Sequence, residues 1–254
     1  MAQAKKAMNS VLSTLRVLEE VSARQPIGVS ELSRVMGIPK SSVQRCLVTL
    51  REAGWLRITD PARSRWGVTM RVLAIGLRGA DEEGFRDLAR PVIKRLAAET
   101  GETVHFALRD GDHLIVVLRE DGTHAVRVFV EIGARLPLPV TSAGVAILAR
   151  LGADEVAEVL ERGVEDFDGE VPGPGELREE IARAAERGYA VTLSGRDRPR
   201  VASFGAVVTG SAGLPVATIT LSVPELRFEA AREEDLARSV VGAAAELSRL
   251  IATS

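Results

Sequence analysis

The stretch VSELSRVMGIPKSSVQRCLVTLREAGWL, residues 29–56, decides the fold of the first part of the chain. Ser30 is placed to cap a short helix over Glu31–Met36, because serine favours the N-cap position. Gly37 permits a sharp reversal of the chain after that helix. A longer helix then fits residues 39–53, with proline in its first turn and glycine directly after its end. The pattern predicts a helix-turn-helix.

The second of these helices has two chemically different sides. The apolar side, spaced as in a helix, is expected to be buried with Leu32 and Val35 of the shorter helix, and consists of Val43, Cys46, Leu47 and Leu50. The polar side consists of Lys40, Ser41, Ser42, Gln44, Arg45 and Thr49. Glutamine pairs with adenine, arginine pairs with guanine, and hydroxyl groups bond to bases or phosphates. This side therefore predicts a surface that contacts operator DNA.

Elements on either side of the helix-turn-helix complete the expected domain. A first helix is indicated by apolar residues at three- and four-residue spacing, namely Met8, Val11, Leu12, Leu15, Leu18 and Val21. After the helix-turn-helix, 56–59 and 65–69 favour two strands joined by the turn 60–64. Arg63 and Arg65 are expected at the tip of this hairpin, where they could contact a phosphate or the minor groove. The sequence thus predicts a winged helix-turn-helix over residues 1–69.

The charge distribution agrees with this prediction. Residues 1–70 contain eleven Lys and Arg but five Asp and Glu, although the whole chain has a net charge of −2. A basic end on an acidic body is typical of a nucleic-acid-binding domain joined to a regulatory domain. Small three-helix units also serve as protein-docking modules, so that alternative stays open.

Composition excludes several classes of protein. No apolar run is long enough to cross a membrane, and the polar, basic start lacks a secretory signal, so we expect a cytosolic protein. Cys46 is the only cysteine, which excludes an internal disulfide and a multi-cysteine metal site, and we expect it to be a buried packing thiol. No cofactor-binding motif or nucleophile elbow is present, so neither a cofactor nor enzymatic activity is expected.

The remainder of the chain alternates between helical and strand patterns. A linker helix fits 70–78, within a linker over residues 70–84, and the domain that follows covers 85–254. Further helices are expected at 88–99, 143–151, 154–161, 176–187 and 227–251. Strands are expected at 103–109, 113–119, 124–131, 189–193, 201–208 and 214–223. The expected class is α+β, with an antiparallel sheet flanked by helices.

These features together resemble the IclR family of bacterial transcription regulators over nearly the whole chain. The helix-turn-helix stretch carries the resemblance in the first domain. In the second domain it is carried by LPLPVTSAGVAILA from residue 136, RGYAVT from 187, VASFGAVV from 201 and ATITLSVP from 217. The resemblance implies a GAF-like effector domain that binds a small metabolite, often an organic acid. It also implies homodimers, or dimers of dimers, assembled through the head and the linker helix.

The resemblance further implies an effector pocket, which falls on Ser142, Ala143, Thr192, Ala202, Phe204, Thr220 and Ser222. An anion would be favoured by the free N–H groups at the start of the helix that begins near Ser142. Thr220 and Ser222 alternate and so share one side of a strand, while Phe204 could form an apolar wall. Plain helix capping and packing are the alternative for these residues. A carboxylate-bearing effector is the working hypothesis.

Two other groups of residues contain side chains that could bind a ligand. His105, His113 and His124 all fall in the expected strands but lack the spacing of metal ligands, so ordinary strand histidines are favoured and no metal is expected. Arg196, Arg198 and Arg200 could neutralise an acid, but an exposed loop is favoured.

The expected function is a regulator that binds a pseudopalindromic operator as a dimer and responds to an effector. An effector-independent dimeric repressor remains the alternative.

Overall fold

The chain divides into two compact units, residues 1–82 and 83–254, which we call the head and the body. Each has a hydrophobic core of its own. The computed structural model describes residues 8–79, 84–164, 171–193, 200–210 and 212–253.

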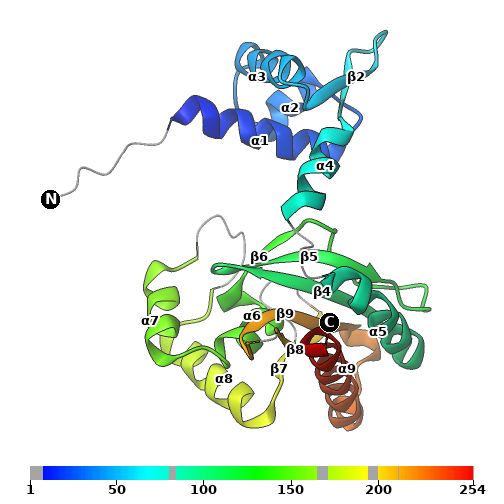
Figure 1. Ribbon diagram of the computed structural model, residues 1–254, viewed down its shortest axis with the longest axis vertical. Helices are drawn as coiled ribbons and strands as arrows, with labels where there is room; N and C mark the ends of the chain where they lie inside the picture. Colours follow the sequence, from blue (N-terminus) through cyan, green and yellow to red (C-terminus); the bar gives the residue numbers. More distant parts are fainter. Residues whose placement is uncertain (1–7, 80–83, 165–170, 194–199, 211, 254) are drawn as a thin grey trace, which may run out of the picture. The chain divides into compact units, whose positions relative to one another are not determined.

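The head combines helices with a small antiparallel sheet (Figure 1). Its helices are α1 Asn9–Arg24, α2 Val29–Met36, α3 Lys40–Glu52 and α4 Met70–Gly79. Its strands are β1 Ile27–Gly28, β2 Leu56–Asp60 and β3 Arg65–Val68, in the order β1-β3-β2. The predicted helix-turn-helix followed by a hairpin is confirmed.

The start of α2 differs from the prediction. The helix begins at Val29, and its N-cap is Gly28. The Gly28 N–H donates to the Glu31 carboxylate at 3.1 Å. A side chain from the first turn of the helix thus satisfies the backbone N–H of the N-cap residue. The prediction that Ser30 caps this helix is therefore wrong. Leu32 is buried, as predicted. Val35 is 46% exposed, so the prediction that it points inward is wrong.

Helix α1 is buried over only part of its length. Val17 and Val21 are fully buried in the head core, and Leu18 packs against it. The apolar residues of the first half are exposed by 47–68%, and these are Met8, Val11, Leu12 and Leu15. The first half of the predicted helix therefore leaves an apolar surface on α1.

The body is built on one six-stranded antiparallel sheet, in the order β6-β5-β4-β9-β8-β7 (Figure 1). The strands are β4 Thr103–Asp110, β5 His113–Glu120, β6 Arg135–Pro137, β7 Ala190–Thr192, β8 Val201–Thr209 and β9 Pro215–Pro224. The helices are α5 Phe85–Thr100, α6 Ser142–Leu148, α7 Ala153–Arg162, α8 Pro174–Arg187 and α9 Glu233–Thr253. Short 3-10 turns lie at Leu138–Val140, Glu225–Arg227 and Ala230–Arg232. The predicted α+β class is confirmed.

One predicted strand is wrong, and several helix bounds differ from the prediction. Helix α5, for example, begins at Phe85, three residues earlier than expected. Residues 124–131 form no strand, and β6 instead pairs with the start of β5. Helix α6 ends at Leu148, three residues before the prediction. Helix α9 begins at Glu233, because 3-10 turns occupy the expected first residues.

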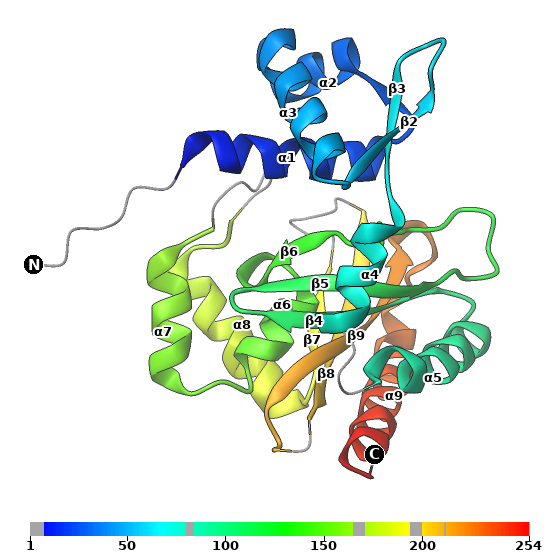
Figure 2. The ribbon, with the colours of Figure 1, turned by 45° about the horizontal axis from the view of Figure 1, so that its top comes forward.

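The two faces of the sheet differ in chemistry. The apolar face packs against α5 and α9, which lie side by side (Figure 2), and consists of Val104, Phe106, Ala202, Phe204, Ala206, Val208, Ala217, Ile219, Leu221 and Val223. The hydroxyl face lies under α6 and consists of Thr103, His105, Ser203, Gly205, Thr218, Thr220 and Ser222. Because side chains alternate along a strand, one register sets both faces.

Candidate DNA-binding surface and effector cavity

Helix α3 presents a continuous polar surface. Five of the six predicted DNA-contacting residues of this helix are exposed, and they are Lys40, Ser41, Gln44, Arg45 and Thr49. Ser42 is half-buried. The opposite side anchors the helix in the head core through the buried residues Val43, Leu47 and Leu50. The geometry thus presents one side of α3 to an external partner.

The cationic groups of this surface are available to a new partner. In the described part of the head, the ion pairs involve Arg24 and Arg65, and none is formed by Lys40, Arg45 or Arg63. Cys46 is half-buried behind them, and the Thr14 hydroxyl donates to its sulfur at 3.5 Å. Unpaired guanidinium and ammonium groups are suited to phosphates and guanine edges.

The two arginines predicted at the hairpin tip occupy different places. Arg63 lies in the turn 61–64, is exposed, and its N–H donates to the Asp60 carboxylate at 3.1 Å. Arg65 lies in β3 opposite Gly28 and forms an ion pair with Glu31. Its predicted place at the tip is wrong, because its guanidinium joins the wing to the start of α2.

The Glu31 carboxylate therefore links three elements of the head. The Gly28 N–H, and then the Arg65 guanidinium, hold the pKa of Glu31 below its ordinary value. Glu31 remains ionised at neutral pH, and the helix start and the wing stay joined.

The hydroxyl face of the body encloses a small cavity of about 30 Å³. It lies between α6, the sheet and the segment that follows β5. The cavity is lined by His105, Ala107, Val116, Val130, Leu136, Thr141, Ser142, Ala143, Ser203, Thr220 and Ser222. Hydroxyl groups and one imidazole therefore converge on an otherwise aliphatic space.

The structure places four of the seven predicted effector residues in this lining, and these are Ser142, Ala143, Thr220 and Ser222. Thr192 pairs with Ser203 across the strands but does not line the cavity. The predictions for Ala202 and Phe204 are wrong. Both lie on the apolar face, where Phe204 is fully buried and packs against Phe228 with ring centroids 6.0 Å apart.

Residues 121–134 follow β5, and one of them, Val130, lines the cavity. The N–H of Val130 donates to His105 Nε2 at 3.0 Å, which ties this segment to the hydroxyl face. The N–H of Thr123 donates to the Gly101 carbonyl at 3.0 Å, while Arg119 lies over the Phe129 ring. We call residues 121–134 the cover segment.

A buried ion pair fixes the other part of the cover segment. Glu102 is 3% exposed and accepts hydrogen bonds from Arg227 Nε at 3.0 Å and Nη2 at 2.6 Å. Arg227 Nη1 also donates to the Val126 carbonyl at 2.8 Å. A buried carboxylate is stabilised by such bidentate pairing. The same guanidinium also binds the backbone of the cover segment at Val126.

The sequence pattern does not identify His105 and Ser203 as cavity residues, although both line the cavity. The signal for Ser203 was present, because it alternates with Phe204 on one strand and lies opposite Ser222 on the next. The histidines do not gather, since His113 begins β5 and His124 lies in the cover segment. Across the described residues, no group of three or more metal-binding side chains is found.

Burial, and then the charge of Arg135, lower the pKa of His113. Arg196 and Arg198 lie outside the described residues. Arg200 follows them with a positive φ of 67°, directly before β8.

The comparison with protein families places both units. Residues 10–59 match the IclR helix-turn-helix domain. Residues 80–249 match the bacterial transcriptional regulator IclR C-terminal domain. The chain belongs to the IclR family. The head of the chain is the DNA-binding domain of this family, whose members are bacterial transcriptional regulators.

Several IclR-family relatives match along the whole chain. The HTH-type transcriptional regulator KipR of Bacillus subtilis is 29% identical, over 95% of this chain and 96% of its own. The transcriptional repressor IclR of Escherichia coli is 26% identical, over 95% of this chain and 89% of its own.

Solved structures show the same fold. An IclR homologue from Microbacterium hydrocarbonoxydans, in complex with 4-hydroxybenzoate, superposes with a TM-score of 0.77 at 21% identity, over 97% of this chain and 100% of that one. A regulator from Rhodococcus sp. RHA1 gives a TM-score of 0.75 at 25% identity, over 97% and 99% of the two chains. Within the described residues, no helix is long and apolar enough to cross a membrane.

Proposed function

We propose that the chain is an effector-controlled transcription regulator, whose operator affinity changes when a small carboxylate-bearing metabolite enters the body. The observation that carries this proposal is the cavity of the hydroxyl face, where buried polar side chains converge under the cover segment. Buried hydroxyl groups are costly unless they are bonded, so their convergence favours a ligand with oxygen acceptors.

The lining suits an organic acid with an apolar part. Ser203 and Ser222 provide hydroxyl donors, His105 provides an imidazole, and Val116 with Leu136 provides aliphatic walls. The Thr141 hydroxyl already accepts the Gly144 N–H at 2.9 Å, so it caps α6. The relative solved with 4-hydroxybenzoate binds a ligand that combines a carboxylate with an apolar ring.

The cover segment must move for such a ligand to enter. A cavity of about 30 Å³ holds one or two water molecules and is far smaller than a metabolite. The Val130 N–H and the Val126 carbonyl are the contacts that would be released or remade on binding. Ligand binding is therefore expected to select a rearranged cover segment.

A homodimer, alone or as a dimer of dimers, is the proposed active form. Besides the apolar surface of α1, the linker helix α4 exposes Met70, Leu73 and Ile75 by 45–73%. Contiguous exposed apolar side chains on a soluble unit mark an interaction surface. A dimer would place two α3 helices on the half-sites of a pseudopalindromic operator, and a change of linker geometry would alter their spacing.

The effector test uses full-length protein and an operator selected from random DNA. The operator affinity of the wild type is measured with and without a panel of small carboxylates that includes 4-hydroxybenzoate. Ser222→Ala should lower the response to the active compound about tenfold, the effect of roughly one lost hydrogen bond, and should leave operator binding unchanged. Ser239→Ala in α9, behind the apolar face, is the matched control.

An unchanged response of Ser222→Ala would remove this residue from the site. If no compound alters operator affinity or melting temperature, the effector-independent dimeric repressor would be the better description. Chemical conversion of the active compound by the protein would instead establish an enzyme, which we do not expect. We expect the protein to act in the cytosol and to need no cofactor.

The DNA-binding test removes one cation from α3. Arg45→Ala should cost about 1–3 kcal/mol of operator binding and relax specificity if Arg45 contacts a base. Arg178→Ala in α8 removes the same charge from an exposed site of the body and should change operator affinity little. Equal losses on operator and random DNA would make Arg45 a phosphate contact.

A further inference from the structure

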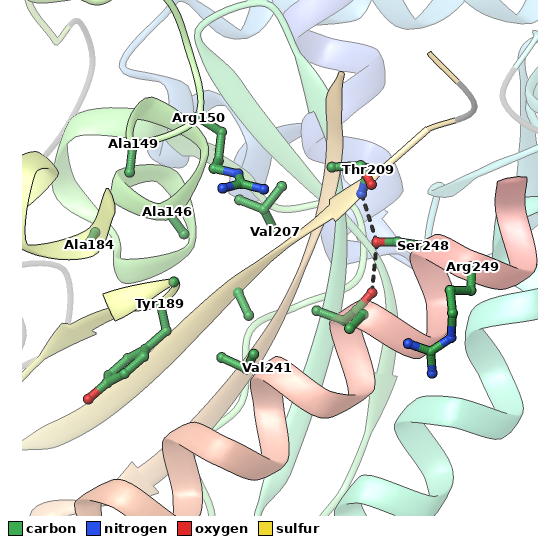
Figure 3. A pocket seen from close by; sticks show the side chains of 14 residues that line it. Ala146, Ala149, Arg150, Ala184, Tyr189, Val207, Thr209, Val241, Ser248 and Arg249 are labelled. Atoms are coloured by element: carbon green, nitrogen blue, oxygen red, sulfur yellow. Dashed lines mark hydrogen bonds between the residues drawn. The ribbon is translucent and has the colours of Figure 1, made fainter. Parts of the chain in front are cut away.

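A second and larger pocket lies at the edge of the sheet of the body, where part of β8 has no neighbouring strand on one side. Strand β7 pairs with residues 203–205 of β8 only. Residues 206–209 of β8 therefore have a strand neighbour only on the β9 side. Helices α6 and α9 flank this free edge, and the pocket between them has a volume of about 410 Å³ (Figure 3). We call it the edge pocket.

Small side chains keep the edge pocket open. Its walls come from α6, α8, β8 and α9, and they consist largely of alanines: Ala146, Ala149, Ala184, Ala206, Ala244 and Ala245. Val207, Val241 and the ring of Tyr189 complete the apolar surface. Apolar walls of this kind suit the hydrocarbon part of a small molecule.

Two cationic side chains line the same pocket from opposite sides. Arg150 follows α6 and is directed toward Val207, and Arg249 belongs to α9 (Figure 3). Both are exposed. No carboxylate of the described chain pairs with either guanidinium, whereas the nearby Glu246 is paired with Arg95.

Two polar groups at the end of the free strand edge already have partners. The Thr209 N–H donates to the Ser248 hydroxyl at 3.0 Å, and that hydroxyl donates to the Ala244 carbonyl at 2.8 Å (Figure 3). The free strand edge is thereby closed by a helix side chain at its last residue. The positive charges of the two arginines, by contrast, have no carboxylate partner in the described structure.

We propose that the edge pocket is a second small-molecule site, which binds a monocarboxylate with an apolar body. The guanidinium of Arg150 or Arg249 would pair with the carboxylate in bidentate geometry, and the alanine walls would contact the hydrocarbon part. This site is separate from the effector cavity, whose lining contains no arginine or lysine.

The two sites share structural elements. Helix α6 contributes Ser142 to the cavity and Ala146 to the edge pocket, and β8 contributes Ser203 to one and Val207 to the other. A ligand in the edge pocket would therefore contact the two elements that shape the cavity. The tests below measure binding without DNA, so the outcome does not depend on the proposed effector response.

Tyr189 allows a direct test, because it is the only tyrosine of the chain. Full-length protein labelled with 3-fluorotyrosine gives a single fluorine resonance at the pocket wall. Titration with benzoate should shift this resonance to saturation, and titration with benzamide, its neutral analogue, should not. The paired substitution Arg150→Ala/Arg249→Ala should weaken benzoate binding at least tenfold, because the charge-assisted contacts are lost.

Two further variants separate this site from the cavity. Ala245→Leu adds bulk at an exposed position of the pocket wall and should abolish the benzoate shift without unfolding α9. Ser222→Ala in the cavity should leave the shift unchanged, and so should Arg178→Ala. A saturable shift lost in Ser222→Ala but kept in the arginine pair would place benzoate in the cavity and overturn the proposal. The absence of any saturable shift up to about 10 mM benzoate, an affinity too weak for a useful site, would do so as well.

Discussion

The two faces of the sheet in the body have the same strands and opposite chemistry. On the apolar face, residues such as Phe106, Phe204 and Ile219 are fully buried against α5 and α9. On the hydroxyl face, Thr103 and Thr218 are as completely buried, yet their hydroxyls have no hydrogen-bond partner among the described residues. Burial alone therefore does not show what a face does.

The difference teaches where stability and function lie. Burial of apolar surface stabilises the fold by roughly 25 cal/mol per Å² and is non-directional. We therefore expect the apolar face to contribute most of the stability of the domain. Buried hydroxyls without partners reduce stability. Thr103 and Thr218 do not line the cavity themselves, but they lie on the same face of the sheet as the hydroxyl groups that do. Substitutions on the two faces should thus have different effects.

The largest effect is expected on the apolar face. Phe204→Ala should lower the free energy of unfolding of the body by about 3–5 kcal/mol, because it removes a fully buried ring and leaves a cavity. Both tryptophans, Trp55 and Trp66, belong to the head, so circular dichroism should report the loss while tryptophan fluorescence follows the head. Phe129→Ala, at a site 53% exposed, is the control and should cost far less. Similar losses of stability for both variants would contradict the assignment of Phe204 to the hydrophobic core of the body.

The two faces also show how far sequence patterns reach. Alternation predicts that Thr220 and Ser222 share one side of a strand, and the resemblance to the IclR family placed that side in the pocket, where both residues lie. The β8 sequence is mostly small and apolar on both sides, so the pattern could not decide which side faces the cavity. Only the pairing of Ser203 with Ser222 shows that Phe204 belongs to the opposite face.

The cover segment was mispredicted for a related reason. Residues 124–131 alternate as a strand should, but β6 occupies the place beside the first residues of β5, His113–Ile115. The packing of Gly122 against the Gly101 and Glu102 backbone, where a Cβ would lie 2.2 Å from the Gly101 carbonyl oxygen, also directs the chain elsewhere. These are tertiary contacts that local periodicity does not contain. The helix-turn-helix, by contrast, depends on local turn signals, and the bounds of its two helices are predicted to within two residues, although the predicted cap at Ser30 is wrong.

A medium effect is expected where α6 approaches the hydroxyl face most closely. A Cβ on Gly205 would lie 2.7 Å from the Ser142 carbonyl oxygen and the Ala143 nitrogen. Gly205→Ala should force α6 away from the sheet and lower stability by about 1–3 kcal/mol, as overpacking does. It should also change the ligand response, because Ser142 lines the cavity.

Gly242→Ala in α9 is the matched control, since a Cβ on Gly242 would have no neighbouring atom within 4 Å in the described structure and alanine favours a helix. Denaturation of the two variants by urea gives the comparison. If Gly205→Ala is as stable as the wild type, the close approach of α6 is not a constraint on this face.

The smallest effect, and the one of opposite sign, is expected at Thr218. Its hydroxyl is fully buried and has no partner in the described structure, so Thr218→Val keeps the shape while it removes a polar atom from an unfavourable place. Stability should rise by about 1 kcal/mol. Thr100→Val is the contrasting control, because the Thr100 hydroxyl donates to the Leu96 carbonyl at 2.7 Å and that bond would be lost. A loss of stability at both positions would mean that the Thr218 hydroxyl is bonded, and unpartnered buried hydroxyls would then no longer distinguish the two faces.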